Sequence, residues 1–155
     1  VRGPNVFKGY WQMPEKTAEE LRSDGYFITG DLGQIDEDGY VQIVGRGKDL
    51  IISGGYNIYP KEIELVIDDQ PGVKESAVIG VPHPDFGESP VAIVVPTGDG
   101  PDLEQITQAC HSALARFKHP RKILICDALP RNTMGKVQKN ALREEHAMLF
   151  ANKES

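Results

Sequence analysis

Residues 45–64 read GRGKDLIISGGYNIYPKEIE, and the order of residue types in this stretch predicts the local fold. The apolar run at 50–52 is too short for a helix and is typical of a buried strand. Gly54 and Gly55 allow the backbone a positive φ or a close approach to a ligand. Pro60 suits the first position of a helix, where its missing N–H leaves no hydrogen bond unmade. We therefore expect a turn, a short strand, a glycine turn and a helix, in that order.

Two cations, Arg46 and Lys48, stand between glycines just before this strand. A cation in a glycine turn can meet a phosphate or a ribose with little steric hindrance. The same short pattern also suits a solvated turn, so its interpretation depends on the rest of the chain.

The length, composition and charge exclude several classes of protein. The chain has 155 residues, enough for one domain or slightly more, and a formal net charge of −6 from 17 basic and 23 acidic residues. This charge argues against binding to nucleic acid or to an anionic membrane. No apolar run reaches the roughly 18–20 residues that span a bilayer. Because the chain begins at Val1 without a signal peptide or an initiator methionine, we expect it to be a segment of a larger protein.

The two cysteines, Cys110 and Cys126, lack the spacing of metal ligands. Both lie in apolar segments, where a free cysteine acts as a small core residue. We predict no metal site on this chain and a reducing, cytoplasmic setting.

Upstream of the opening stretch, the sequence predicts a β-hairpin. An Asp-Gly turn at 36–39 separates two alternating runs, a strong hairpin signal. A hairpin of this length would bring Asp31, at its start, close to Arg46, just past its end. Farther upstream, Thr17 and Glu20 have the spacing of a capping box, which predicts a short helix that begins at Thr17.

Downstream, alternating strand and helix signals predict an α+β domain. The apolar run at 91–95 is β-branched except at Ala92, as expected of a central strand. Asp102 has the position of a helix cap, and an apolar stripe follows it. The predicted elements are strands at 74–81, 91–95 and 123–126, helices at 60–70 and 137–150, and a third helix whose buried stripe comprises Leu103, Ile106, Cys110, Leu114 and Phe117. We expect a small mixed sheet covered by helices.

Three motifs, in order, resemble the adenylate-forming acyl-CoA synthetases. The opening stretch is similar to their GRxKD…GG…N…P.EIE signature, YFITGD at 26–31 precedes it, and PRNTMGK at 130–136 follows it. The resemblance covers nearly the whole chain. Among subfamilies it is greatest to the malonate–CoA ligases, through NVFKGYW at 5–11 and RNTMGKVQKN at 131–140.

This resemblance implies the domain organisation and the activity. Residues 1–47 would form the C-terminal end of a large adenylation domain, a β-hairpin region, and residues 48–155 a mobile C-terminal lid. The full-length enzyme would join malonate or a related small acid to CoA, with ATP, Mg²⁺ and CoA as substrates or cofactors. The missing N-terminal domain would be its partner, and this chain alone would be inactive and bind none of these tightly. The alternatives are the lid of another acyl- or aryl-CoA ligase, or a non-catalytic binding module of the same fold.

The resemblance also implies roles for particular residues. Lys136 would be catalytic and contact both the carboxylate and the α-phosphate. Asp31 would accept hydrogen bonds from the paired ribose hydroxyls, and Arg46 would meet the ribose or a nearby phosphate. Asn57 stands where the family often has a nucleotide-contacting arginine. By contrast, Lys139 is interpreted as an ordinary surface lysine.

The remaining roles implied by the resemblance concern the transfer of the acyl group to CoA, which follows adenylation. Lys48 corresponds to the hinge about which the family rotates its lid. One pose would present the Lys136 loop for adenylation, and the other would present Gly54 and Gly55 to CoA, with the pantetheine arm close to Gly55. A plain turn is the alternative for both glycines.

Overall fold

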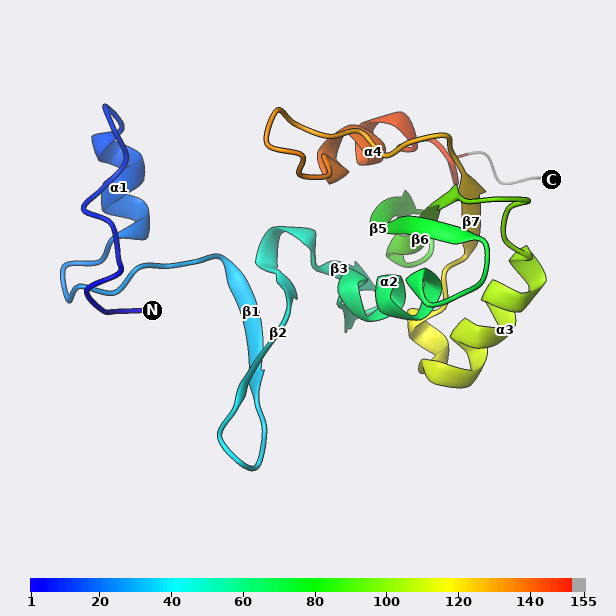
Figure 1. Cartoon of the computed structure of the whole chain (residues 1–155), viewed down its shortest axis with the longest axis horizontal. Coiled ribbons are helices and arrows are strands. Elements are labelled where there is room, and N and C mark those ends of the chain that lie inside the picture. Colours follow the sequence, from blue (N-terminus) through cyan, green and yellow to red (C-terminus); the bar gives the residue numbers. More distant parts are fainter. Residues whose placement is uncertain (152–155) are drawn as a thin grey trace. The chain divides into compact units, whose positions relative to one another are not determined.

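The computed structural model describes residues 1–151. The chain divides into two compact units: a first unit, Val1–Lys48, and a second unit that begins at Asp49 (Figure 1). The assignment of residues 1–47 to a large adenylation domain and of residues 48–155 to a lid remains a prediction.

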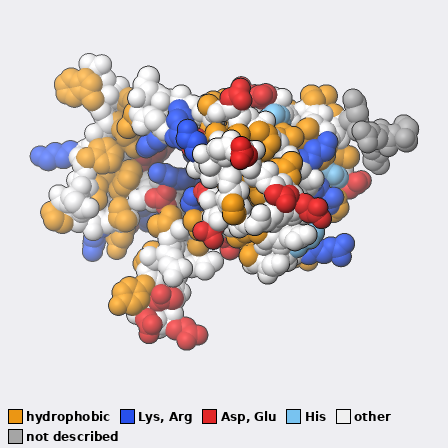
Figure 2. Space-filling model, turned by 45° about the vertical axis from the view of Figure 1, so that its right-hand side comes forward, with side chains coloured by type: hydrophobic (Ala, Val, Ile, Leu, Met, Phe, Trp, Pro, Cys, Tyr) orange, Lys and Arg blue, Asp and Glu red, His pale blue; other side chains and the backbone are white. Residues whose placement is uncertain are grey.

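The first unit contains a helix and a hairpin. Helix α1 is Pro14–Glu20, and the antiparallel strands β1, Asp31–Ile35, and β2, Val41–Arg46, form the hairpin. A short 3₁₀ helix, η1, Gly47–Asp49, follows β2. The predicted hairpin is thus confirmed. None of residues 1–48 is buried, and hydrophobic and acidic side chains stand exposed together on the hairpin in the lower part of Figure 2.

The predicted start of α1 at Thr17 was wrong. The helix begins at Pro14, with Met13 as the residue before it, so Thr17 lies inside the helix. Its hydroxyl donates to the Met13 carbonyl (2.8 Å) and accepts the Tyr10 N–H (2.9 Å). The fixed φ of Pro14 suits the first helical position, and the Thr17 hydroxyl is engaged by the chain upstream rather than by a capping box.

The second unit is built on a mixed five-stranded sheet within residues 49–151. Strands β3, β6 and β5 lie antiparallel, β4 pairs with β3, and β7 runs parallel to β6. The bounds are β3 Ile51–Ser53, β4 Tyr56–Ile58, α2 Pro60–Asp68, β5 Val73–His83, β6 Gly87–Pro96, α3 Leu103–Ala113, η2 Arg116–Lys118, β7 Lys122–Ile125 and α4 Lys139–Glu145. The predicted α+β class, with a small mixed sheet covered by helices, is confirmed.

Alternate residues of β5 and β6 fill two separate cores, one on each face of the sheet. Val78 and Ala92 pack with Ile63, Ile67 and the α3 residues on one face. On the other face, Ile79 and Ile93 pack with Leu142 of α4. The first core is made of Ile51, Ile58, Ile63, Ile67, Val73, Val78, Ala92, Val94, Ile106 and Cys110, and the second of Ala77, Ile79, Val81, Val91, Ile93, Val95, Leu129 and Leu142. Helices α2 and α3 therefore cover one face and α4 the other.

Several boundaries differ from the sequence prediction. Strand β4 was not expected, and β5 and β6 extend beyond their apolar runs into a long ladder. Pro82 fits within β5 because this strand lies at the edge of the sheet, where a missing N–H is tolerated. Helix α4 is shorter than the predicted 137–150. Asp102 caps α3 as predicted, since its Oδ1 accepts the N–H groups of Glu104 and Gln105.

The predicted stripe of α3 is correct only in its middle. Ile106 and Cys110 are buried, whereas Leu103 and Phe117 are exposed. Phe117 lies beyond the helix, in η2, because α3 ends at Ala113. No helix within residues 1–151 is both long and apolar enough to cross a membrane.

Candidate active site

Lys136 closes a tight turn that leads toward α4. The side-chain oxygen of Asn132 accepts the N–H groups of Met134 (3.0 Å) and Lys136 (2.9 Å), and the Asn132 N–H donates to the Lys136 carbonyl (2.9 Å). Gly135 has a φ of +78°, a left-handed conformation that favours glycine. These bonds fix the backbone of the Lys136 loop, residues 131–137.

Two ion pairs hold the ends of this loop to strand β5 and helix α2. Arg131, at its start, binds Glu75 of β5. Lys139, just beyond its end, binds Glu64 of α2 with an Nζ–Oε1 distance of 2.5 Å, and the same oxygen accepts the Val78 N–H (2.9 Å). The side chains of Lys139 and Glu64 are 17% and 8% exposed, so the interpretation of Lys139 as an ordinary surface lysine was wrong. Glu64 is distant in sequence, and only the fold brings it next to Lys139, the first residue of α4.

The Lys136 side chain itself is exposed and makes no ion pair with another residue of the described chain. A fixed backbone that carries an unengaged ammonium group is suited to electrostatic stabilisation, because the donor needs little reorganisation when charge develops on a ligand. An interior location for this side chain would have excluded a catalytic role.

The hairpin of the first unit brings three predicted site residues together. Asp31 is directly opposite Arg46 in the ladder, and Arg46 Nε lies 2.9 Å from Asp31 Oδ1. A second guanidinium nitrogen of Arg46 donates to the Thr29 carbonyl (2.8 Å). Asp31, Arg46 and Lys48 line one open cavity of about 750 Å³. The Asp31 Oδ2 atom has no hydrogen-bond partner among residues 1–151 and remains able to accept one.

Gly54 and Gly55 form the two-residue turn between β3 and β4. Their φ values are +56° and +83°, as in the type I′ turns that close tight hairpins. A Cβ on Gly55 would meet no atom within 4 Å, whereas one on Gly54 would lie 3.3 Å from the Phe86 ring. The turn chemistry thus accounts for both glycines, and the space beside Gly55 leaves its backbone accessible.

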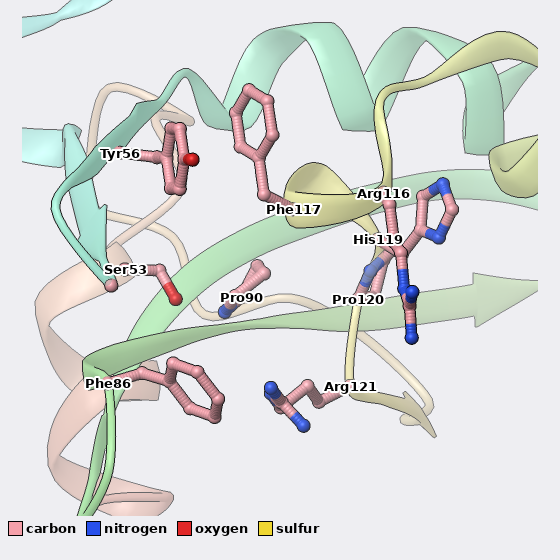
Figure 3. A pocket seen from close by; sticks show the side chains of 10 residues that line it. Ser53, Tyr56, Phe86, Pro90, Arg116, Phe117, His119, Pro120 and Arg121 are labelled. Carbon is pink, nitrogen blue, oxygen red and sulfur yellow. The ribbon is translucent and has the colours of Figure 1, made fainter.

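A cavity of about 350 Å³ opens beside Gly54 and is lined by aromatic and cationic side chains. Figure 3 shows Phe86 and Arg121 facing one another in this cavity, and the Arg121 guanidinium lies 4.2 Å from the centre of the Phe86 ring. Tyr56 and Phe117 stack with their ring centres 4.5 Å apart. The lining comprises Ser53, Gly54, Tyr56, Phe86, Pro90, Arg116, Phe117, His119, Pro120 and Arg121. A cavity lined by both aromatic rings and guanidinium groups suits a ligand that carries both a planar ring and phosphates.

The sequence interpretation missed this cavity. Residues 116–122 read RFKHPRK, and this run of cations around an aromatic residue was the available signal. The segment is held in place by Lys118, whose Nζ donates to Glu62 of α2 at 3.0 Å. Phe117 was predicted to be a core residue, but the end of α3 turns it toward Tyr56.

Asn57 is separate from both cavities. It lies on the edge strand β4, opposite Ile52, and its side chain is exposed. Neither cavity is lined by it. Within residues 1–151, no group of three or more His, Cys, Asp or Glu residues is placed to hold a metal ion.

The fold described above is that of the C-terminal domains of adenylate-forming enzymes. Residues 62–136 match the family model of the AMP-binding enzyme C-terminal domain, which identifies this part of the chain as a member of that family. Its relatives include the long-chain-fatty-acid–CoA ligase FadD13 of Mycobacterium tuberculosis, 46% identical over 95% of this chain, and a 2-succinylbenzoate–CoA ligase of Geobacillus kaustophilus, 45% identical over 92%. The chain spans 29% of the length of each of these two relatives.

Among solved structures, the ATP-bound MatB of Rhodopseudomonas palustris aligns with 96% of this chain and 30% of its own. The sequence identity is 62% and the TM-score is 0.83. The likeness therefore extends through both units of the chain, including the hairpin that carries Asp31 and Arg46.

Proposed function

We propose that this chain is the C-terminal part of an AMP-forming acid–CoA ligase. The observation that carries the proposal is the exposed ammonium group of Lys136 on an immobilised loop, in a chain whose curated relatives are CoA ligases of different acids. In the first half-reaction, a carboxylate oxygen attacks the α-phosphorus of ATP and pyrophosphate leaves. In the second, the thiol of CoA attacks the acyl carbon, and AMP leaves.

Lys136 is assigned to the first half-reaction. Negative charge spreads over the attacking oxygen and the α-phosphate as the bond forms, and a positioned cation lowers the energy of that arrangement. The ATP bound to MatB supports ATP as the nucleotide. We assign Mg²⁺ to the phosphates of ATP, as part of the substrate.

Asp31 and Arg46 are assigned to the nucleotide. One oxygen of Asp31 is held by Arg46 and the other is available, so the carboxylate is oriented before a ribose hydroxyl arrives. Arg46 retains exposed surface for a phosphate or ribose oxygen. Asn57 could contact the nucleotide only if the ligand reaches the exposed edge of β4, and we place it last among these assignments.

The second half-reaction is assigned to the cavity beside Gly54. CoA carries an adenine ring, a diphosphate and a further phosphate, and the aromatic and arginine side chains of the cavity complement those groups. The accessible backbone at Gly55 would let the pantetheine arm pass. Because Lys136 and Gly54 serve different half-reactions, Lys48 is proposed as the hinge that presents them in turn.

Malonate or a related small acid is our proposed substrate, from the motifs at 5–11 and 131–140. The 62% identity to MatB, against 46% to the long-chain-fatty-acid ligase, favours a substrate other than a long-chain acid. We propose a cytoplasmic setting for the full-length enzyme, and negligible turnover by this chain without its N-terminal domain.

The test uses the full-length ligase and two assays. Pyrophosphate exchange measures adenylation, and transfer from a supplied acyl-adenylate to CoA measures thioester formation. Lys136→Ala should slow the exchange by roughly 100-fold or more and leave the transfer within a few-fold of normal. Lys74→Ala, at an exposed lysine without an ion pair in the described chain, is the matched control. Equal losses in both assays would refute the assigned role of Lys136.

A second experiment tests the CoA assignment. Arg121→Ala should raise the KM for CoA about tenfold while pyrophosphate exchange is unchanged, since one charge-assisted contact is removed. An unchanged KM for CoA would remove the cavity from the proposed site. A panel of malonate, methylmalonate, acetate and long-chain acids then identifies the acid.

A further inference from the structure

An ion pair joins the start of the second unit to its last helix. Arg143 of α4 donates through Nη2 to Asp49 Oδ1 at 2.7 Å, across 94 residues of sequence. Asp49 follows Lys48, the proposed hinge, and Arg143 belongs to the helix that follows the Lys136 loop. The pair therefore connects the residue beside the pivot with the helix that directly follows the loop of the proposed catalytic lysine.

The geometry of this pair is more restrained than that of a typical surface ion pair. The side chains of Arg143 and Asp49 are 23% and 16% exposed. A second nitrogen of the guanidinium, Nη1, donates to Asn140 Oδ1 at 2.7 Å, one turn earlier on α4. With its plane held at two points, Arg143 loses little further freedom when it binds Asp49.

Backbone pairing does not restrain Asp49. The ladder between β3 and β4 begins at Ile51, and β3 pairs with β6 only at Ser53. Residues 49 and 50 thus precede the sheet, and Asp49, the last residue of η1, is tied to the body of the second unit by its ion pair with Arg143. A hinge delivers a defined rotation only when the segment beside its pivot is stiff.

We propose that Asp49 and Arg143 are positioning residues that confine the rotation to Lys48, so that the Lys136 loop and the Gly54 turn move with the pivot as one body. The proposal rests on the proposed function, in which one rotation serves both half-reactions. Loss of the pair lengthens the flexible segment and lowers the population of each productive pose, without touching the reacting atoms.

The experiment uses Arg143→Met, the milder Asp49→Asn, and the charge swap Asp49→Arg with Arg143→Asp in the full-length ligase. Each single variant should slow pyrophosphate exchange and thioester transfer by a similar factor, roughly 3- to 30-fold, with the KM for ATP little changed. The two single losses should not add when Asp49→Asn and Arg143→Met are combined in one double variant, and the charge swap should recover part of the rate. Glu144→Gln, at an exposed position on the same helix, is the control.

Limited proteolysis gives a readout that does not depend on activity. Trypsin cleaves after lysine, and the Lys48–Asp49 bond should be cut faster in Arg143→Met and Asp49→Asn than in the parent or in Glu144→Gln. An unchanged rate of cleavage at Lys48–Asp49 would overturn the proposal. So would additive losses of rate in the double variant, or a loss of rate in pyrophosphate exchange alone. If Lys136→Ala leaves adenylation intact, the proposed function fails, while the cleavage rates still report on the pair.

Discussion

The two units of this chain differ in how they use their apolar residues. In the second unit, both faces of the sheet are covered, and the fully buried side chains include Ile63, Ile79 and Ile93. In the first unit no residue is buried, and the hairpin exposes Ile35, Tyr40, Val41 and Ile43. A hairpin without a covered face is marginally stable in water.

This difference distinguishes a self-sufficient fold from a segment that depends on other contacts. The second unit carries the Lys136 loop and the Gly54 turn on a close-packed core, which resists deformation and would suit the proposed rotation. The first unit holds Asp31 and Arg46 on a hairpin whose apolar side chains gain little within that unit. Exposed apolar residues of this kind often mark a contact surface, and the assignment of residues 1–47 to a large adenylation domain stays a prediction.

The largest expected effect comes from separating the two units. Expressed alone, residues 49–155 should unfold cooperatively on heating and show dispersed amide resonances. A peptide of residues 1–48 should show neither, because it buries no side chain within its own unit. Circular dichroism measures the thermal transition and NMR the dispersion of the amide resonances. A cooperative transition in the 1–48 peptide would contradict the claim that the first unit depends on other contacts.

A matched pair of isoleucine substitutions sharpens the comparison. Ile93→Ala removes a side chain that is 1% exposed in the central strand β6 and should destabilise the second unit by about 2–5 kcal/mol. Ile43→Ala, at a position that is 62% exposed, should change the stability of the chain by less than about 0.5 kcal/mol. Urea unfolding at constant pH measures both, and similar losses for the two variants would refute the distinction.

Breaking an ion pair should also destabilise the second unit more than the first, with smaller losses of stability than for the isoleucine substitutions. Lys139→Met leaves the buried carboxylate of Glu64 with only the longer contact to Lys61, whose Nζ lies 3.7 Å from Oε2, and should cost about 1–3 kcal/mol. Adenylation should also slow, since Lys139 anchors the end of the Lys136 loop. Arg22→Met breaks the exposed pair with Asp24 and should cost at most about 1 kcal/mol. Unfolding curves that rank these two variants in the opposite order would contradict the role of Lys139.

Features encoded by neighbouring residues were predictable from the sequence. The Asp-Gly turn fixed the hairpin that pairs Asp31 with Arg46, Pro60 set the start of α2, and Asp102 capped α3. Each depends on residues a few positions apart, whose preferences act in the unfolded chain as well as in the native one.

Features made by distant residues were not predictable. Lys139 appeared to be a surface lysine because its partner Glu64 is 75 positions away, and the aromatic cavity joins Tyr56 with Phe117. Strand β4, by contrast, was missed although its signal is local, because the Gly54–Gly55 turn folds residues 56–58 back onto β3.

The smallest expected effect concerns the pH dependence of the second unit. Burial raises the pKa of the Cys110 thiol above the ordinary value of 9.0, because the thiolate is disfavoured away from water. The folded chain therefore binds this proton more tightly than the unfolded chain does. The resulting stabilisation is fully present below the pKa of the unfolded thiol and is lost as the pH rises through the raised pKa of the folded one.

Urea unfolding of residues 49–155 at pH 7, 9 and 10 tests this dependence, with Cys110→Val as the variant that lacks the titrating group. The parent should lose stability between pH 9 and 10 more steeply than Cys110→Val, since other groups titrate equally in both. Cys126 contributes in the same direction, because burial is the largest cause of its raised pKa, and Cys126→Ser measures its share. The Cys110 thiol should also react slowly with iodoacetamide at pH 8 until urea exposes it. Rapid alkylation in the folded state would show that α3 does not seal the core that distinguishes the second unit from the first.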